Sequence, residues 1–236
     1  MNKKVLDAQE VINTISVLHD RISERFSNSG LSNICKILEG IATRAAEKEA
    51  WIAKPIWWLR GLVTAGCSVF VALAIIVTYL LFKPFFDAGA LKNVITNVET
   101  EINFMILIGG GTLFLWTLEN RYKRWRALQA IHELRSVAHV IDMHQLTKDP
   151  DRVLSNDQQT SSSPEFHMTS YELRRYLDYC SEMLSLTGKV AALYVQKFDD
   201  PVALAAASEV ETMSTGLARK IWQKLMILHS IKDQTG

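Results

Sequence analysis

The polar side chains whose types and spacing could do chemistry are gathered between positions 132 and 144. His132 and His139 are seven residues apart and so share one face of a helix, and Asp142 follows about one turn after His139. Side chains of these types could hold a metal ion or sense protons. The four-residue histidine spacing of zinc proteases is absent, however, and His144 falls on another face. We interpret these side chains as solvated or hydrogen-bonded, and pH or ligand sensing by His132, His139 and Asp142 is the alternative.

No other pattern indicates an enzyme. The sequence contains no Walker A loop, no dinucleotide-binding glycine fingerprint and no nucleophile elbow. Its three cysteines, Cys35, Cys67 and Cys180, are far apart and predict neither a disulfide framework nor a zinc site. The net charge of +1 gives no bulk attraction to nucleic acid. We therefore expect no enzymatic activity, no cofactor, no metal and no nucleic-acid partner.

The element that organises the chain is the apolar run at 61–82, which holds no charged residue and lies between Arg60 and Lys83. A bilayer core about 30 Å thick needs roughly 20 apolar helical residues, and this run supplies them. A soluble helix of that length would show a polar face, whereas the polar residues here are limited to Thr, Ser, Cys and Tyr. The run predicts a membrane span, and a fully buried soluble helix is the alternative.

A second apolar run at 102–118 is shorter and is interrupted by Gly109, Gly110 and Gly111. Apolar residues at helical spacing precede this run, which predicts that its helix begins near Leu91. We expect a second span here, joined to the first by an outside loop at 83–101. A buried or re-entrant helix is the alternative.

Small and hydroxyl-bearing residues recur along both spans. Thr64, Ser68 and Ala72 are spaced every four residues and so lie on one side of a helix. Small residues let helix backbones approach closely, and hydroxyls can bond across the contact. The residues expected either to pack the spans together or to face a polar lumen in an oligomer are Thr64, Ser68, Ala72, Thr78, Gly109, Gly110, Gly111 and Thr112.

Aromatic and basic residues mark the ends of the spans. Indole rings favour the headgroup zone, and basic side chains bind anionic headgroups. The expected membrane-interface anchors are Trp51, Trp57, Trp58, Trp116, Arg121, Lys123, Arg124 and Arg126. Contact with a ligand phosphate is the alternative role of the basic cluster. Since the connecting loop carries only Lys83 and Lys92 as basic residues, both termini are expected on the cytoplasmic side.

The flanking segments read as helices. Apolar stripes over 5–26 and 31–45 predict an N-terminal helical hairpin, with Ser32 capping its second helix. Pro55 predicts a break before the first span. The helical pattern then continues from 120 to 145 without a breaker, so the second span is expected to extend into a cytosolic stalk.

The C-terminal part is predicted to form a second helical hairpin. Thr169 with Glu172 is typical of a capping box, and Asp200-Pro201 predicts the start of the last helix. The expected segments are 1–58, N-terminal helices and interfacial segment; 59–120, the two spans; 121–146, the stalk; 147–167, a flexible linker; and 168–236, the C-terminal hairpin.

The layout of short N-terminal helices, a two-span hairpin and the basic helix start ENRYKRWRALQAIHELRSVAHVIDMHQ resembles bacterial two-transmembrane effectors of the SLATT type over roughly residues 30–146. That resemblance implies self-assembly into pores and an association with nucleotide-signalled conflict systems. The helical hairpin beyond residue 168 is additional to that layout.

These observations together predict an all-α membrane protein: a two-span transmembrane hairpin with a cytosolic bundle formed by N- and C-terminal helices. We expect an oligomeric pore- or channel-forming effector, and a non-conducting scaffold that recruits a cytosolic partner is the alternative. The expected partners are the lipid bilayer, further copies of the chain, and a cytosolic protein or small-molecule signal. The expected location is the bacterial inner membrane.

Overall fold

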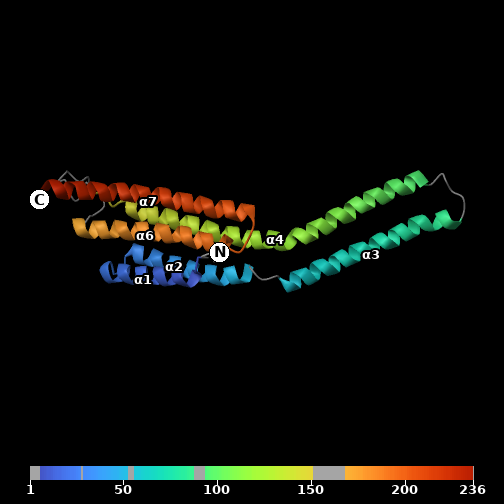
Figure 1. Cartoon of the computed structure of the whole chain (residues 1–236), viewed down its shortest axis with the longest axis horizontal. Coiled ribbons are helices and arrows are strands. Elements are labelled where there is room, and N and C mark those ends of the chain that lie inside the picture. The colour runs from blue at the N-terminus through green and yellow to red at the C-terminus, as the bar shows by residue number, and fades with distance from the viewer. Residues whose placement is uncertain (1–5, 28, 53–55, 88–93, 151–167, 236) are drawn as a thin grey trace, which may run out of the picture. The chain divides into compact units, whose positions relative to one another are not determined.

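The computed structural model of this chain describes residues 6–27, 29–52, 56–87, 94–150 and 168–235. Throughout these ranges the regular secondary structure is α-helical, which confirms the predicted all-α class (Figure 1). The helices are α1 (Ala8–Arg25), α2 (Gly30–Ile52), α3 (Trp57–Asp87), α4 (Val94–Leu146), α6 (Ser170–Val195) and α7 (Pro201–Thr235).

The chain divides into two compact units. Residues Met1–Ala53 and Arg124–Gly236 form one unit, which we call the bundle, and Lys54–Lys123 form the other, which we call the helix pair. The helix α4 contributes its first part to the helix pair and its last part to the bundle.

The bundle is held together by the apolar stripes that the sequence predicts. Each stripe repeats at three and four residues and therefore forms one face of its helix. The buried members are Ile15, Leu18 and Ile22 of α1; Leu31, Ile34, Leu38, Ile41 and Ala45 of α2; Ile131, Leu134, Ala138 and Ile141 of α4; and Val210, Leu217, Ile221 and Leu228 of α7. Val11 of α1, which the predicted stripe does not include, is buried as well. Trp125, which the spacing places on the α4 stripe, is exposed instead.

The central element of the bundle is α6. Fourteen of its 26 residues are buried, so it is covered on more than one face. It packs against α1, α2 and α7, and α7 lies alongside it (Figure 1). The buried Gly188 allows this closeness, because a Cβ there would already lie 3.5 Å from the Glu211 side chain of α7.

Helix caps explain where the bundle helices begin. Thr169 and Glu172 form the predicted capping box of α6, with reciprocal hydrogen bonds of 3.2 and 2.8 Å. Asp200 caps α7 as predicted. The predicted cap at Ser32 is wrong: α2 begins at Gly30, and the Ser29 hydroxyl accepts the Ser32 N–H at 3.2 Å. Ser32 therefore lies within the first turn of α2, and its hydroxyl bonds the Ser23 hydroxyl at 2.8 Å.

The helices of the pair extend further than the apolar runs. The predicted loop at 83–101 is helical at 83–87 and again at 94–101, because hydropathy measures the apolar length of a helix and not its full length. The predicted start near Leu91 lies outside the described residues, as does 151–167 of the predicted linker. The predicted break before the first span is confirmed, since α2 ends at Ile52 and α3 begins at Trp57.

Candidate functional site

The first candidate site is the apolar surface of α3. Among the described residues, one helical segment has the length and composition to cross a membrane, Arg60–Leu80, and none of it is buried. The run at 102–118 lies within α4 and does not meet the same criterion, so two crossings remain a prediction. Its 17 residues would rise only about 25 Å, and its glycine triplet lowers its hydropathy.

Glycines, rather than the predicted hydroxyl strip, mark the contact between α3 and α4. A Cβ on Gly66 would lie 3.1 Å from Leu115, and a Cβ on Gly111 would lie 3.5 Å from the Phe70 ring. Thr64, Ser68 and Ala72, in contrast, are all exposed. Which of the two expected roles this strip has stays a prediction.

The glycine triplet of α4 neither breaks nor ends the helix, which runs on to Leu146. Gly109 and Gly110 are exposed, and a Cβ on either would meet nothing within 4 Å. Gly111 and Thr112 are half-buried, as is Thr78 of α3. The contact with Phe70 thus explains why a glycine is needed at position 111, but it does not explain Gly109 or Gly110.

A carboxylate of α4 binds residues at the start of α3, at one end of the helix pair. Glu119 of α4 accepts hydrogen bonds from the backbone N–H of Ile56 at 3.3 Å and from Arg60 Nε at 2.8 Å, and it pairs with Lys123 Nζ at 2.8 Å. Burial alone would raise the pKa of the Glu119 carboxyl, but these three donors lower it to about 2. Glu119 therefore remains charged at neutral pH and joins the start of α3 to α4.

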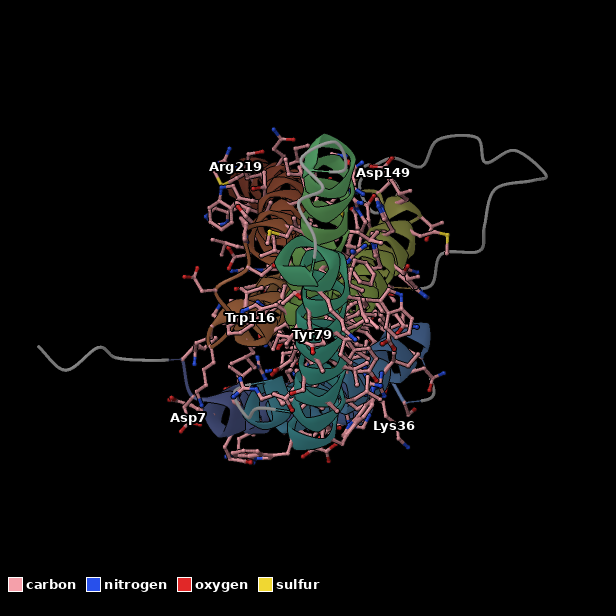
Figure 2. The ribbon with its side chains drawn as sticks, turned by 90° about the vertical axis from the view of Figure 1, so that its right-hand side faces the viewer. Asp7, Lys36, Tyr79, Trp116, Asp149 and Arg219 are labelled. Carbon is pink, nitrogen blue, oxygen red and sulfur yellow. The ribbon has the colours of Figure 1, made fainter. Side chains whose placement is uncertain are left out.

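The predicted interface anchors differ in their surroundings. Trp57, Trp58 and Trp116 are exposed, and Figure 2 labels Trp116 together with the exposed Tyr79. Trp51 lies in α2, and its side chain is outside the described residues. Among the basic anchors, Arg121 stacks on the Phe114 ring and Arg126 is half-buried. Lys123 is buried against Glu119, and Arg124 bonds Asp200 at 2.8 Å, so both have carboxylate partners.

The predicted histidine cluster is spread over the surface of α4. His132 and His139 are exposed, and Asp142 accepts a hydrogen bond from Gln145 at 2.7 Å. His144 packs against Gly30 of α2, and burial followed by the charge of Lys148 lowers its pKa. Within the described part of the chain, no group of three His, Cys, Asp or Glu side chains is arranged to hold a metal ion.

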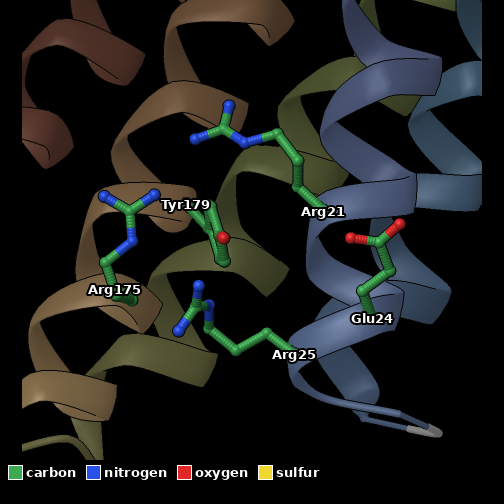
Figure 3. A pocket seen from close by; sticks show the side chains of 5 residues that line it. All are labelled: Arg21, Glu24, Arg25, Arg175 and Tyr179. Carbon is green, nitrogen blue, oxygen red and sulfur yellow. The ribbon is translucent and has the colours of Figure 1, made fainter.

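A second candidate site, which the sequence alone does not indicate, is an open pocket of about 370 Å³ on the bundle (Figure 3). It is lined by Arg21, Glu24 and Arg25 of α1 and by Arg175 and Tyr179 of α6. The one local signal was spacing: Arg21 and Arg25, and likewise Arg175 and Tyr179, are four residues apart and so share a helix face.

The arginines of this pocket are arranged around one phenol. The guanidiniums of Arg21 and Arg175 each lie 5.2 Å from the centre of the Tyr179 ring. Hydrogen bonding to the Tyr179 hydroxyl raises the pKa of Arg25 and of Arg175. Burial would raise the pKa of Tyr179, but its hydrogen bonds with the two arginines outweigh burial and lower it.

Cys35 and Cys180 lie outside both sites, whereas Cys67 is part of α3. All three are free, and Cys35 and Cys180 are buried in the bundle, where burial raises the pKa of each thiol to about 12. A protonated, buried thiol is a poor nucleophile.

Comparison with known protein families, with curated proteins and with solved structures finds no match to this chain.

Proposed function

We propose that this chain is an oligomeric membrane protein whose helix pair enters the bilayer and whose assembly opens a pore. The observation that carries the proposal is the exposure of an uncharged apolar surface on α3. Val69, Ile75 and Leu80 are 67%, 64% and 58% exposed. A continuous apolar surface of this kind is costly in water and favourable in lipid.

The two chain segments that make up the bundle support a second crossing that returns the chain to the first side. Residues 1–53 and 124–236 belong to one compact unit, so both must lie in one compartment. A single crossing by α3 would separate them. A second crossing within 94–118 keeps them together, even though that run is short and rich in glycine. Bilayers thin locally around short spans at modest cost.

The exposed strip of small residues supports assembly. Thr64, Ser68 and Ala72 are exposed on α3 and are free to meet another copy of the chain or a lumen. The Thr64 hydroxyl donates to the Gly61 carbonyl at 3.0 Å, which satisfies its proton and leaves the oxygen as an acceptor. The resemblance to SLATT-type effectors is consistent with an oligomeric pore.

The test is dye release from liposomes containing the purified chain, together with the mass of the complex in detergent. We expect an oligomer and dye release from the wild type. The double variant Thr64→Leu/Ser68→Leu should stay in the membrane but lose most of the release, because two bulky apolar side chains replace the hydroxyls. Val69→Leu, about 100° around the same helix from Ser68, is the matched control and should leak like the wild type. A monomer in tight liposomes contradicts the proposal.

The second candidate function is a non-conducting scaffold, and one feature of the bundle favours it. Trp222 and Met226 of α7 are 63% and 50% exposed and lie one turn apart. Exposed Trp and Met are typical of protein interfaces. Recovery of one stoichiometric cytosolic protein, lost in Trp222→Ala and unaffected by Thr64→Leu/Ser68→Leu, would select the scaffold.

A further inference from the structure

We propose that the pocket between α1 and α6 binds a small, soluble phosphorylated molecule through Arg21, Arg25 and Arg175. The inference concerns the bundle alone and does not depend on whether α3 enters a membrane. It starts from the convergence of three guanidiniums from two helices on one pocket (Figure 3). A guanidinium offers five N–H donors in a planar fork, and this geometry suits phosphate oxygens.

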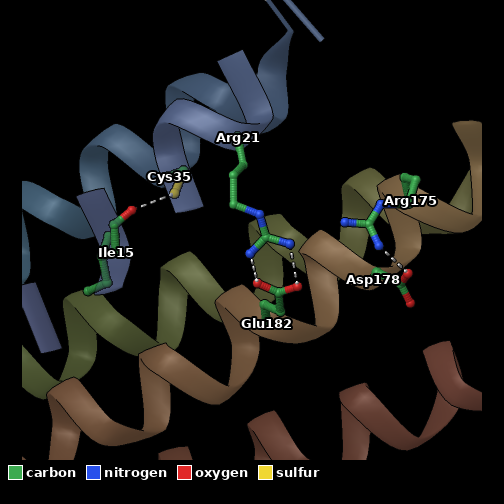
Figure 4. A network of polar contacts seen from close by, with 6 residues as sticks. All are labelled: Ile15, Arg21, Cys35, Arg175, Asp178 and Glu182. Carbon is green, nitrogen blue, oxygen red and sulfur yellow. Dashed lines mark hydrogen bonds and ion pairs between the residues drawn. The ribbon is translucent and has the colours of Figure 1, made fainter. Parts of the chain in front are cut away.

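Two of the arginines form ion pairs with carboxylates that do not line the pocket. Arg21 makes a bidentate pair with Glu182, at 2.9 and 3.3 Å, and Arg175 bonds Asp178 at 3.4 Å (Figure 4). Such pairs fix the direction of a guanidinium and leave its other N–H groups free. They also offset part of the positive charge, which allows the cluster to exist without a ligand.

Among the described residues, some N–H groups of Arg25 and Arg175 still have no carboxylate acceptor after these pairs are counted. In the described part of the chain no carboxylate pairs with Arg25, whose guanidinium instead lies 5.3 Å from the centre of the Tyr171 ring. The Arg175 Nε is buried and has no hydrogen-bond partner. A buried donor without a partner costs free energy, so the contact with Asp178 leaves the Arg175 guanidinium incompletely satisfied.

Donor geometry and size both favour a phosphate ester. Three arginines, one glutamate and a tyrosine line the pocket, and Glu182 and Asp178 offset the charges of Arg21 and Arg175, so the pocket offers guanidinium donors rather than a net positive charge. A phosphate brings three acceptor oxygens and up to two negative charges, which such donors bind well. The volume of about 370 Å³ lies at the lower end of small-molecule sites, large enough for a phosphate with a modest organic group.

The test uses inorganic pyrophosphate as the probe, titrated into the full chain in uncharged detergent at low salt. We expect one site per chain. Arg25→Gln should weaken binding by at least about tenfold, because it removes a charged donor that no carboxylate holds. Arg25→Lys, which keeps the charge and loses the fork, should fall between. Arg219→Gln, an exposed arginine on α7 labelled in Figure 2, is the control and should bind like the wild type.

Three results would overturn the inference: no binding to the wild type below about 1 mM, equal binding by Arg25→Gln, or equal weakening by Arg219→Gln. If Arg25→Gln loses helix content, this variant is set aside, and the inference then stands or falls on whether the wild type binds pyrophosphate. Competition separates the sources of phosphate. Displacement of pyrophosphate by inorganic phosphate, with none by short-chain phosphatidic acid, supports a soluble ligand. Stronger displacement by phosphatidic acid contradicts it and assigns the site to a lipid headgroup.

Discussion

Asp200 makes two kinds of contact at the start of α7. Its Oδ1 accepts the backbone N–H groups of Val202 and Ala203 at 3.1 and 2.9 Å, which caps the helix. Its Oδ2 lies 2.7 Å from an Arg124 guanidinium nitrogen, which ties α7 to α4. The side chain is almost fully buried. Burial would raise the pKa of this carboxyl, but Arg124 and the two N–H groups outweigh burial and lower it.

We expect Asp200→Ala to open the start of α7. The loss of a cap and of a charge-assisted bond should cost about 2 kcal/mol. Amide hydrogen exchange across 201–210 should then be about 30-fold faster, since each 1.4 kcal/mol is a factor of ten. Unchanged exchange in this segment would show that the cap is dispensable.

The conservative variant Asp200→Asn separates the cap from the charge and gives the pH dependence. Asparagine still caps, so its exchange should lie between wild type and Asp200→Ala. The pKa of Asp200 is lowered in the folded chain, so its stabilisation is complete above the ordinary aspartate value of about 3.9 and is lost as the pH falls through the lowered value. The advantage of wild type over Asp200→Asn should therefore be constant from about pH 5 to 8 and vanish in acid.

Side-chain roles could be predicted from the sequence where the partner is local. The Thr169–Glu172 box and the Asp200 cap were both identified, because each bonds within three residues. The partner of Arg124 is 76 residues away, and Arg21 meets Glu182 across 161 residues. A single sequence holds no signal for such pairs, so the arginine pocket could not be predicted.

At the scale of helices, periodicity predicted which face of each bundle helix is buried but not how the apolar helices meet. A span that is apolar on every side has no stripe to identify its contact face. The four-residue spacing of Thr64, Ser68 and Ala72 suggested one face, whereas Gly66 and Phe70 lie on the face that contacts α4. This face makes the contact because Gly66 leaves room for Leu115 of α4, and Gly111 of α4 leaves room for the Phe70 ring.

Gly66→Leu should therefore weaken the helix pair. A Cβ at this position would be 3.1 Å from Leu115 Cδ1, so the further carbons of a leucine would have to displace the Leu115 side chain or α4 itself, at about 1–3 kcal/mol. We expect a lower midpoint temperature for the detergent-solubilised chain, followed by size-exclusion chromatography after heating. Gly61→Leu is the matched control, since a Cβ there meets nothing within 4 Å and leucine is the better helix former. An equal loss in both variants would show that Gly66 is not a contact.

At the scale of the whole chain, connectivity and composition lead to different counts of crossings. Composition identifies one candidate span, Arg60–Leu80, while the bundle joins residues from before and after the helix pair. If α3 crosses a membrane, the chain must cross back before residue 124. A hydropathy criterion treats each segment separately and cannot include this constraint. The compact bundle therefore favours two crossings more strongly than the sequence of 102–118 does by itself.

Single cysteine reporters test this topology. We expect Lys83→Cys, just past the candidate span, to react with a membrane-impermeant maleimide in intact spheroplasts. Lys36→Cys in α2 and Arg219→Cys in α7 should react only after permeabilisation, because the proposed return crossing puts both on the inner side. All three positions are exposed (Lys36 and Arg219 are labelled in Figure 2). Cys67→Ser provides the background, since Cys35 and Cys180 are buried with pKa values raised to about 12. Opposite sides for Lys36→Cys and Arg219→Cys would mean a single crossing and a divided bundle, and one side for all three would mean that α3 does not cross.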